Sequence, residues 1–204
     1  MPAQIVHSLD SQSPFTLAIW SITESEDVLH QQWSALASPE TMPAIKVSHR
    51  RCEWLASRLL LHELNVGPLQ FLSNGKPVIT KGGVSISHSG KQVAVATYEA
   101  AIGIDIQTPT EQLFTIRHKF CSPTEWRWLE QHEEPLRALT MVWSAKEAVF
   151  KYWGERVVFA QEMEVMPFQC KDEHLHLRYR GVHGRRDFRL WHTCIDSLEI
   201  VVAI

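Results

Sequence analysis

The sequence has few of the features that mark secreted, membrane or nucleic-acid-binding proteins. Its 204 residues include only four cysteines, at positions 52, 121, 170 and 194. These lie far apart with no C-x-x-C pair, which indicates neither a disulfide framework nor a zinc site. The formal net charge of −3 argues against binding of bulk nucleic acid, which usually needs a basic surface. The longest apolar runs, such as LEIVVAI at 198–204, are too short to span a bilayer.

The start of the chain, MPAQIVHSLD, has no basic segment followed by an apolar stretch, so no secretory signal is visible. Together with the unpaired thiols, this predicts a cytoplasmic protein with neither a membrane nor a nucleic acid as partner. Hydrophobic residues make up 45% and charged residues 21%, which are ordinary values for a globular protein. The length allows a real core, in one domain or two small lobes.

The pattern of helices and strands predicts an α+β fold. Helices are predicted over 24–36, 44–64 and 135–153, with Gly154 ending the last one, and a capping box starts another helix at Ser122. Strands are predicted over 15–22, 84–87, 92–98, 101–106, 174–179, 187–194 and 198–204. Helices followed by strands, twice over, indicate a pseudo-duplicated fold with lobes at 1–100 and 101–204. We expect a mostly antiparallel sheet under helices in each lobe, and an active site between the lobes.

Asp105 is the most informative single residue. It stands between Ile104 and Ile106 in a predicted strand, so its carboxylate should point away from the isoleucine face. A carboxylate at a strand end suits Mg²⁺, which prefers hard oxygen ligands, and Gln107 on the same side offers a neutral oxygen. A turn or capping aspartate is the simpler alternative.

A predicted helix contributes a second carboxylate. Trp143, Glu147 and Lys151 are four residues apart and therefore share one helix face. Glu147 and Lys151 form only a surface ion pair on the simplest interpretation. The neighbouring aromatic residues favour a partly buried face, on which a carboxylate needs a partner such as a metal ion. Lys146 and Lys151 would then offer positive charge to phosphate oxygens.

The segment SISHSG at 85–90 follows an apolar strand. Ser87 and His88 suit phosphate binding at a strand end, although a lone histidine is more often structural. Ser85, Ser87 and Ser89 are also candidate nucleophiles of a serine hydrolase. No G-x-S-x-G motif surrounds them and His88 has no credible acid partner, which argues against hydrolase chemistry.

Four short segments occur in a specific order: GKP at 75–77, SISHS at 85–89, GID at 103–105, and WSAKEA at 143–148 followed by Lys151. By these segments the chain resembles the 4′-phosphopantetheinyl transferases of the pseudo-dimeric, surfactin-synthetase-activating type. The resemblance implies transfer of phosphopantetheine from coenzyme A (CoA) to a serine of an apo acyl or peptidyl carrier protein, with release of 3′,5′-ADP. It also implies Mg²⁺ as cofactor. Both sets of motifs lie in one polypeptide, so we expect a competent monomer.

The resemblance assigns roles to individual residues. Asp105 and Glu147 would bind Mg²⁺ together with Gln107, while Glu147 and Lys151 would carry the chemistry. The predicted contacts to CoA are Arg51, Arg58, Lys76, Pro77, Ser87, His88, Lys146 and Lys151.

One position departs from the family pattern. Many members carry glutamate where this chain has Gln107, and a neutral amide should weaken Mg²⁺ binding. The alternative function is therefore a non-catalytic homologue that binds CoA or a carrier protein. Retention of Asp105, Glu147 and Lys151 argues for the enzyme.

A basic stretch at 178–189 leaves a further alternative open. It contains five arginines and His183, and carrier proteins are commonly acidic, so a docking surface is one interpretation. A solvated hairpin face is the other.

Overall fold

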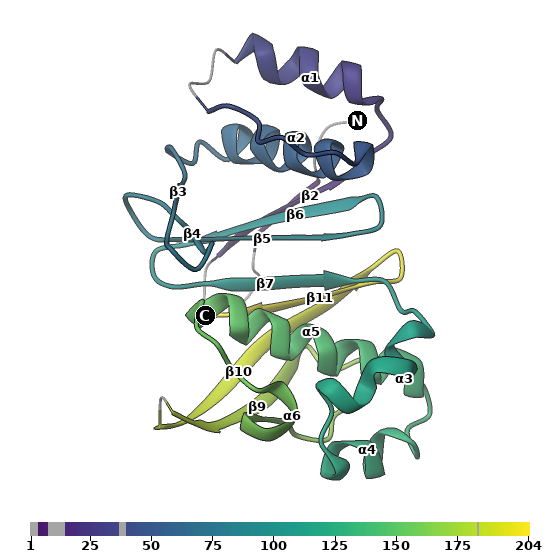
Figure 1. Cartoon of the computed structure of the whole chain (residues 1–204). Helices are drawn as coiled ribbons and strands as arrows, with labels where there is room; N and C mark the ends of the chain where they lie inside the picture. The colour runs from purple at the N-terminus through teal and green to yellow at the C-terminus, as the bar shows by residue number, and fades with distance from the viewer. Residues whose placement is uncertain (1–3, 8–14, 37–39, 183) are drawn as a thin grey trace.

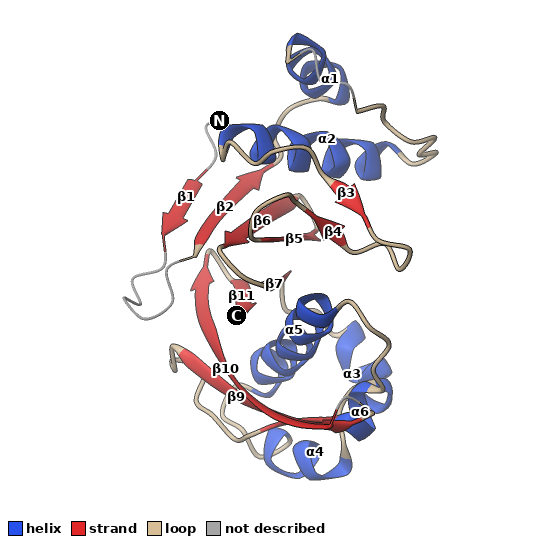
Figure 2. Cartoon of the chain, turned by 90° about the vertical axis from the view of Figure 1, so that its left-hand side faces the viewer, coloured by secondary structure: helices blue, strands red, loops and turns tan. Residues whose placement is uncertain are grey.

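Two antiparallel sheets face one another at the centre of the molecule, with helices on their outer faces (Figure 1, Figure 2). The computed structural model describes residues 4–7, 15–36, 40–182 and 184–204. In spatial order, the first sheet consists of β1 (Gln4–His7), β2 (Thr16–Ser21), β6 (Gln92–Tyr98) and β5 (Gly83–Ser89). The second consists of β7 (Gly103–Gln107), β11 (Leu198–Ala203), β10 (Gly184–Ile195), β9 (His174–Gly181) and β8 (Met163–Val165). A small hairpin joins β3 (Gln70–Phe71) to β4 (Pro77–Val78). The predicted α+β class is confirmed.

All four predicted helices are present, and the described residues form three further short helices that were not predicted. They are α1 (Glu26–Ala35), α2 (Ser48–Glu63), α3 (Gln112–Ile116), the 3₁₀ helix η1 (Arg117–Lys119), α4 (Pro123–Leu129), α5 (Pro135–Trp153) and α6 (Phe159–Glu162). Gly154 ends α5 in the left-handed conformation, with φ of 72°, and the capping box at Ser122 is present. α2 begins four residues later than predicted. The carbonyls of Ile45 and Lys46 accept hydrogen bonds from the Arg51 guanidinium, which holds that segment outside the helix.

Alternating residues of four strands build the core between the two sheets. Residues on one face of β2 and β6 pack against residues on one face of β7 and β11. The members of this central cluster include Leu17, Ile19, Ala94, Ala96, Ile104, Ile106, Ile200 and Val202. Because side chains alternate along a strand, the residues between them face the helices instead. Two further cores result, one under α2 and one under α5.

This alternation decides where Asp105 points. Ile104 and Ile106 belong to the central cluster, whereas Asp105 contacts Lys151 of α5. The prediction that the carboxylate points away from the isoleucine face is confirmed.

Gly103 brings α5 unusually close to β7. A Cβ atom at this position would lie 2.0 Å from the carbonyl oxygen of Ala148 and 2.5 Å from the amide nitrogen of Tyr152. No side chain fits into that space, so the glycine of the GID segment permits direct contact between the strand and helix backbones. The side chains of Asp105 and Lys151 meet as a result.

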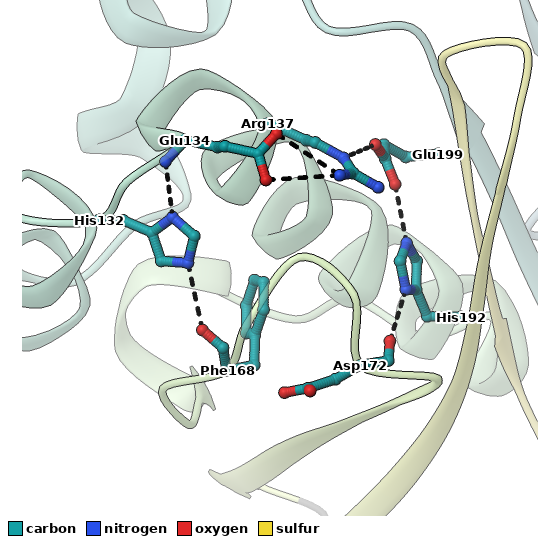
Figure 3. A network of polar contacts seen from close by, with 7 residues as sticks. All are labelled: His132, Glu134, Arg137, Phe168, Asp172, His192 and Glu199. Atoms are coloured by element: carbon teal, nitrogen blue, oxygen red, sulfur yellow. Dashed lines mark hydrogen bonds and ion pairs between the residues drawn. The ribbon is translucent and has the colours of Figure 1, made fainter.

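A buried polar network fixes the other end of α5 to the second sheet (Figure 3). Glu199 of β11 is 1% exposed and accepts hydrogen bonds from Arg137 Nε of α5 (2.5 Å) and His192 Nε2 of β10 (2.7 Å). His192 Nδ1 lies 2.8 Å from the carbonyl oxygen of Asp172. Burial raises the pKa of Glu199, but the hydrogen bonds from His192 and Arg137 outweigh it, so the pKa lies below its ordinary value. The network anchors the first turn of α5.

Candidate active site at the junction of β5, β7 and α5

Asp105, Ser87 and Lys151 meet where β5, β7 and α5 come together. Asp105 Oδ1 accepts hydrogen bonds from Ser87 Oγ (2.9 Å) and Lys151 Nζ (2.8 Å). Lys151 Nζ also lies 2.9 Å from Ser87 Oγ. An ammonium group has three donors, and the described residues accept from two of those of Lys151, which leaves one for a further acceptor. The side chain of Lys151 is 25% exposed, and that of Asp105 is 8% exposed.

Glu147 lies one turn before Lys151 on the same face of α5. Burial is the main reason that its pKa is raised to about 7, and repulsion from Asp105 adds to the rise while Lys151 opposes it. The two predicted metal ligands are therefore close enough to feel each other's charge. Lys151 is the cation that acts on both carboxylates, through a hydrogen bond to Asp105 and through its charge on Glu147.

These residues fit a bound magnesium ion. Asp105 Oδ2 is buried and has no hydrogen-bond partner among the described residues, which is costly for a carboxylate oxygen. Mg²⁺ commonly binds through one or two carboxylates together with substrate phosphates and water. No cluster of three or more histidine, cysteine, aspartate or glutamate side chains suited to a metal occurs in the described part of the chain. Asp105 and Glu147 supply the two carboxylates of a site whose other ligands would be substrate phosphates and water.

Gln107 lies on the same face of β7 as Asp105, two residues further on. Its amide nitrogen donates to the carbonyl oxygen of Thr108 at 2.9 Å, and its cross-strand partner is Glu199. Contact between Gln107 and a metal ion stays a prediction.

His88 lies on the opposite side of β5 from Ser87 and faces α2. Arg50 Nη1 is 2.9 Å from His88 Nε2 and 3.0 Å from Glu53 Oε2. Burial lowers the pKa of His88, and the nearby cations Arg50 and Lys151 lower it further against the effect of Glu53. A neutral imidazole accepts the hydrogen bond from the arginine. The pair lines a cavity of about 360 Å³ beside α2, large enough for a phosphate group and part of its ester.

The hydrolase alternative finds no support in this geometry. Ser85, Ser87 and Ser89 are at most 8% exposed, and their hydroxyls accept hydrogen bonds from backbone amides of β7 and the residue after it. They point away from His88, because residues 85, 87 and 89 alternate with 86 and 88.

Two predicted CoA contacts on α2 are already engaged by carboxylates. Arg51 forms a two-pronged ion pair with Glu26, with distances of 2.5 and 2.8 Å, and does not line the cavity beside His88. Arg58 lines that cavity, but its guanidinium bonds Glu40 and stacks on Trp54 at 4.5 Å from the ring centroid.

Arg50 was missed by sequence reasoning, although a signal exists. Residues 50, 54, 57 and 58 all line the cavity, and their spacing of four, three and one is that of one helix face. Arg51 was predicted because it lies seven residues before Arg58 and therefore on the same helix face. That spacing does not show whether Arg50 or Arg51 faces the cavity, because the rotation of the helix against the sheet is not known from the sequence.

Lys76 reaches across to the end of α5. Its Nζ donates to the carbonyl oxygen of Tyr152, and Asn74 Nδ2 donates to the carbonyl oxygen of Gly154. Burial lowers the pKa of Lys76. Pro77 follows as the first residue of β4. The GKP segment and Asn74 thus hold the hairpin β3–β4 against the C-terminal end of α5.

Lys146 does not join this group, which corrects the predicted phosphate contact. Its side chain is 0% exposed, and Nζ bonds Glu125 Oε2 at 2.7 Å and the carbonyl oxygens of Phe120 (2.6 Å) and Met163 (2.9 Å). Helix geometry is the physical reason, because residue 146 lies on the buried face with Val142 and not on the face of Glu147. The lysine ties α5 to α4 and β8.

The basic stretch forms the hairpin of β9 and β10, with His183 outside the described residues. Arg180 stands directly opposite Arg185. Arg186 stacks on Tyr152 of α5, 5.0 Å from the ring centroid, and donates to its hydroxyl at 2.9 Å. Docking of a carrier protein here stays a hypothesis.

Comparison with known proteins decides the family. The model of the 4′-phosphopantetheinyl transferase superfamily matches residues 101–204, which is half of the chain and contains Asp105, Glu147 and Lys151. The chain belongs to this superfamily. Lys76 and His88 lie in the other half of the chain, before the matched segment.

The chain is similar to three proteins that are named as 4′-phosphopantetheinyl transferases. A protein of Haemophilus influenzae named "Putative 4′-phosphopantetheinyl transferase" is 28% identical over 65% of this chain and 63% of its own length. The 4′-phosphopantetheinyl transferase AcpT of Salmonella typhimurium is 31% identical over 52% of this chain and 60% of its own. The 4′-phosphopantetheinyl transferase psf-1 of Bacillus pumilus is 31% identical over 50% and 48%. The chain thus matches about half to two thirds of the length of these relatives. Within the described ranges, none of its helices is both long and apolar enough to cross a bilayer.

Proposed function

We propose that this superfamily member is a 4′-phosphopantetheinyl transferase that moves phosphopantetheine from CoA to a serine of an apo carrier protein. Membership in the superfamily and the names of the three relatives support the reaction class. The surfactin-synthetase-activating subtype, the monomeric state, the cytoplasmic location and the division into lobes at 1–100 and 101–204 stay predictions.

The observation that carries the proposal is the group at Asp105. A buried carboxylate oxygen without a partner among the described residues, a second carboxylate with a pKa of about 7, and a partly exposed lysine lie together where β5, β7 and α5 meet. A structural ion pair would satisfy both carboxylates. A site that awaits a metal-bound pyrophosphate would leave them in this state.

In the proposed reaction the serine oxygen forms a bond to the phosphorus that carries the pantetheine arm. The bond from that phosphorus to the bridging oxygen of the pyrophosphate breaks, and the oxygen leaves with 3′,5′-ADP. Glu147 accepts the serine proton, directly or through water. Lys151 places its positive charge beside the phosphate oxygens, because phosphoryl transfer depends mainly on positioning and charge neutralisation.

Asp105 and Glu147 would hold Mg²⁺, with Gln107 as a neutral third candidate. When bound there, Mg²⁺ orients the pyrophosphate and neutralises its oxygens. Lys76 and the Arg50–His88 pair are proposed to bind the nucleotide end of CoA, because Lys76 and Arg50 supply positive charge and Arg50 and His88 line a cavity beside α2.

Mass spectrometry of apo carrier proteins tests the proposal. With enzyme, CoA and Mg²⁺, a suitable apo carrier should gain one phosphopantetheine group, and EDTA should stop the reaction. The panel should include fatty-acid, polyketide and peptide carriers, because each presents a similar serine. If a folded enzyme that binds CoA modifies none of them, the alternative of a non-catalytic CoA-binding or carrier-binding homologue replaces the transferase.

A further inference from the structure

The two sheets are joined at their edges by serine side chains. β5 is the edge strand of the first sheet, and β7 is the edge strand of the second. Ser85, Ser87 and Ser89 accept hydrogen bonds from the backbone amides of residues 104, 106 and 108, at 3.0, 3.2 and 3.1 Å. We call this row of three hydroxyls the serine seam.

The serine seam provides hydrogen-bond acceptors for backbone amides at a buried sheet edge. An edge strand presents a row of unpaired amides, and buried amides need hydrogen-bond partners. Here a side-chain oxygen of β5 takes the place of a backbone carbonyl at every second residue. The three serines are 3%, 3% and 8% exposed, so water does not compete for these bonds. The seam therefore fixes the register of β7 against β5.

Ser87 is the central member and also holds the candidate metal ligand. Its hydroxyl donates to Asp105 Oδ1 and accepts from the amide of Ile106 and from Lys151 Nζ. A hydroxyl has one donor and two acceptor positions, so its capacity is filled. It has nothing left for a phosphate oxygen, unlike the CoA contact expected from the sequence.

We propose that Ser85, Ser87 and Ser89 are positioning residues for the metal ligand Asp105. The proposal rests on the proposed function. Ser87 and Lys151 both bond Oδ1, which fixes the rotation of the carboxylate and leaves Oδ2 without a partner in the described part of the chain. The two outer serines hold the strand that carries Asp105 in register. Groups that orient a metal ligand typically contribute 10–100-fold to metal affinity.

The first test compares Ser87→Ala with Ser144→Ala. Ser144 is a matched control because its buried hydroxyl on α5 has no hydrogen-bond partner among the described residues. Mn²⁺ binding is measured by calorimetry with CoA present and no carrier protein, and CoA binding is measured separately in EDTA. Ser87→Ala should raise the dissociation constant for Mn²⁺ about tenfold. It should change that for CoA in EDTA less than about twofold, and Ser144→Ala should change neither.

Two results would overturn the role of Ser87. An equal loss of CoA affinity in EDTA would make Ser87 a direct CoA contact. Unchanged Mn²⁺ affinity in Ser87→Ala, or no Mn²⁺ binding by the wild-type protein with CoA, would remove the positioning role altogether.

The second test examines the outer members of the seam. In Ser85→Ala the amide of Ile104 should exchange with solvent faster, and in Ser89→Ala the amide of Thr108 should do so, as measured by NMR hydrogen exchange. Both variants should also weaken Mn²⁺ binding, by less than Ser87→Ala does. Faster exchange with unchanged Mn²⁺ affinity would make these two serines structural only. None of these measurements uses a carrier protein, so failure of the transferase assay and failure of the seam are distinguishable.

Discussion

Lys146 and Lys151 stand five residues apart on one helix but in different surroundings, since the side chain of Lys146 is 0% exposed and that of Lys151 is 25% exposed. Replacing Lys146 with methionine keeps the length of the side chain but removes the cation from a site with 0% exposure on both partners. The Glu125 carboxylate is then buried without its counter-charge. Breaking a buried pair in this way costs about 3–5 kcal/mol. For a chain of 204 residues that corresponds to a fall in Tm of about 10 °C.

Lys151→Met should behave differently. Its side chain is 25% exposed and its loss leaves Asp105 bonded to Ser87, so we expect a loss of only about 1–2 kcal/mol. Its rate in the proposed modification of a carrier protein should fall steeply, because the positive charge proposed to lie beside the phosphate oxygens is removed. Urea unfolding and calorimetry give the stabilities, and mass spectrometry of the carrier gives the rate.

The double variant Glu125→Gln/Lys146→Met is the control for the buried pair. Removing both charges should recover most of the stability lost in Lys146→Met, as a double-mutant cycle would show. If Lys146→Met loses less than about 1 kcal/mol and instead raises KM for CoA, Lys146 contacts phosphate and the structural role is wrong.

Four further outcomes are expected. Glu147→Gln should lower kcat by about 100-fold or more with the fold intact, and a near-normal kcat would reduce the pair with Lys151 to a surface ion pair. In EDTA, the raised pKa of Glu147, about 7, makes its contribution to stability fully present below about pH 4.5 and lost as the pH rises through 7. Wild type should therefore lose up to about 3 kcal/mol relative to Glu147→Gln between pH 5 and 8 in urea unfolding, and parallel curves would contradict the burial of this carboxyl. Arg50→Ala should raise KM for CoA about tenfold, whereas Arg51→Ala should leave it near wild type, and the reverse order would support the CoA contact predicted for Arg51. Gln107→Glu should lower the Mg²⁺ concentration for half-maximal rate, and an unchanged midpoint would place residue 107 out of reach of the ion.

The sequence predicted the backbone well where a local signal was strong. α5 begins at Pro135 and ends at Trp153 as predicted, because proline favours the first turn and Gly154 favours the left-handed end. The side of β7 on which Asp105 lies also followed from the alternation of Ile104 and Ile106. These inferences need only neighbouring residues and a period of two or 3.6.

Contacts between distant elements were not predictable in the same way. The burial of Lys146 depends on Glu125 and on carbonyls from three other segments, although its position four residues after Val142 was a hint. The choice between Arg50 and Arg51 depended on the rotation of α2, which packing against the first sheet decides. The serines at 85, 87 and 89 recur at every second residue. Their partners are backbone amides, which every residue except proline has, so the sequence does not indicate which amides they contact.

Gly154 shows how a residue without a side chain can look functional in a mutational survey. Its left-handed conformation ends α5, and the aliphatic stem of Lys76 lies where a Cβ would be, 2.5 Å from Cδ. Any substitution therefore displaces the lysine as well as straining the helix end. An alanine scan scored by CoA turnover would rank Gly154 beside the charged residues, and only the stability of the same variants would separate the two effects. Tolerance at this position is set by the lysine of another segment, so positions 76 and 154 are expected to change together during divergence.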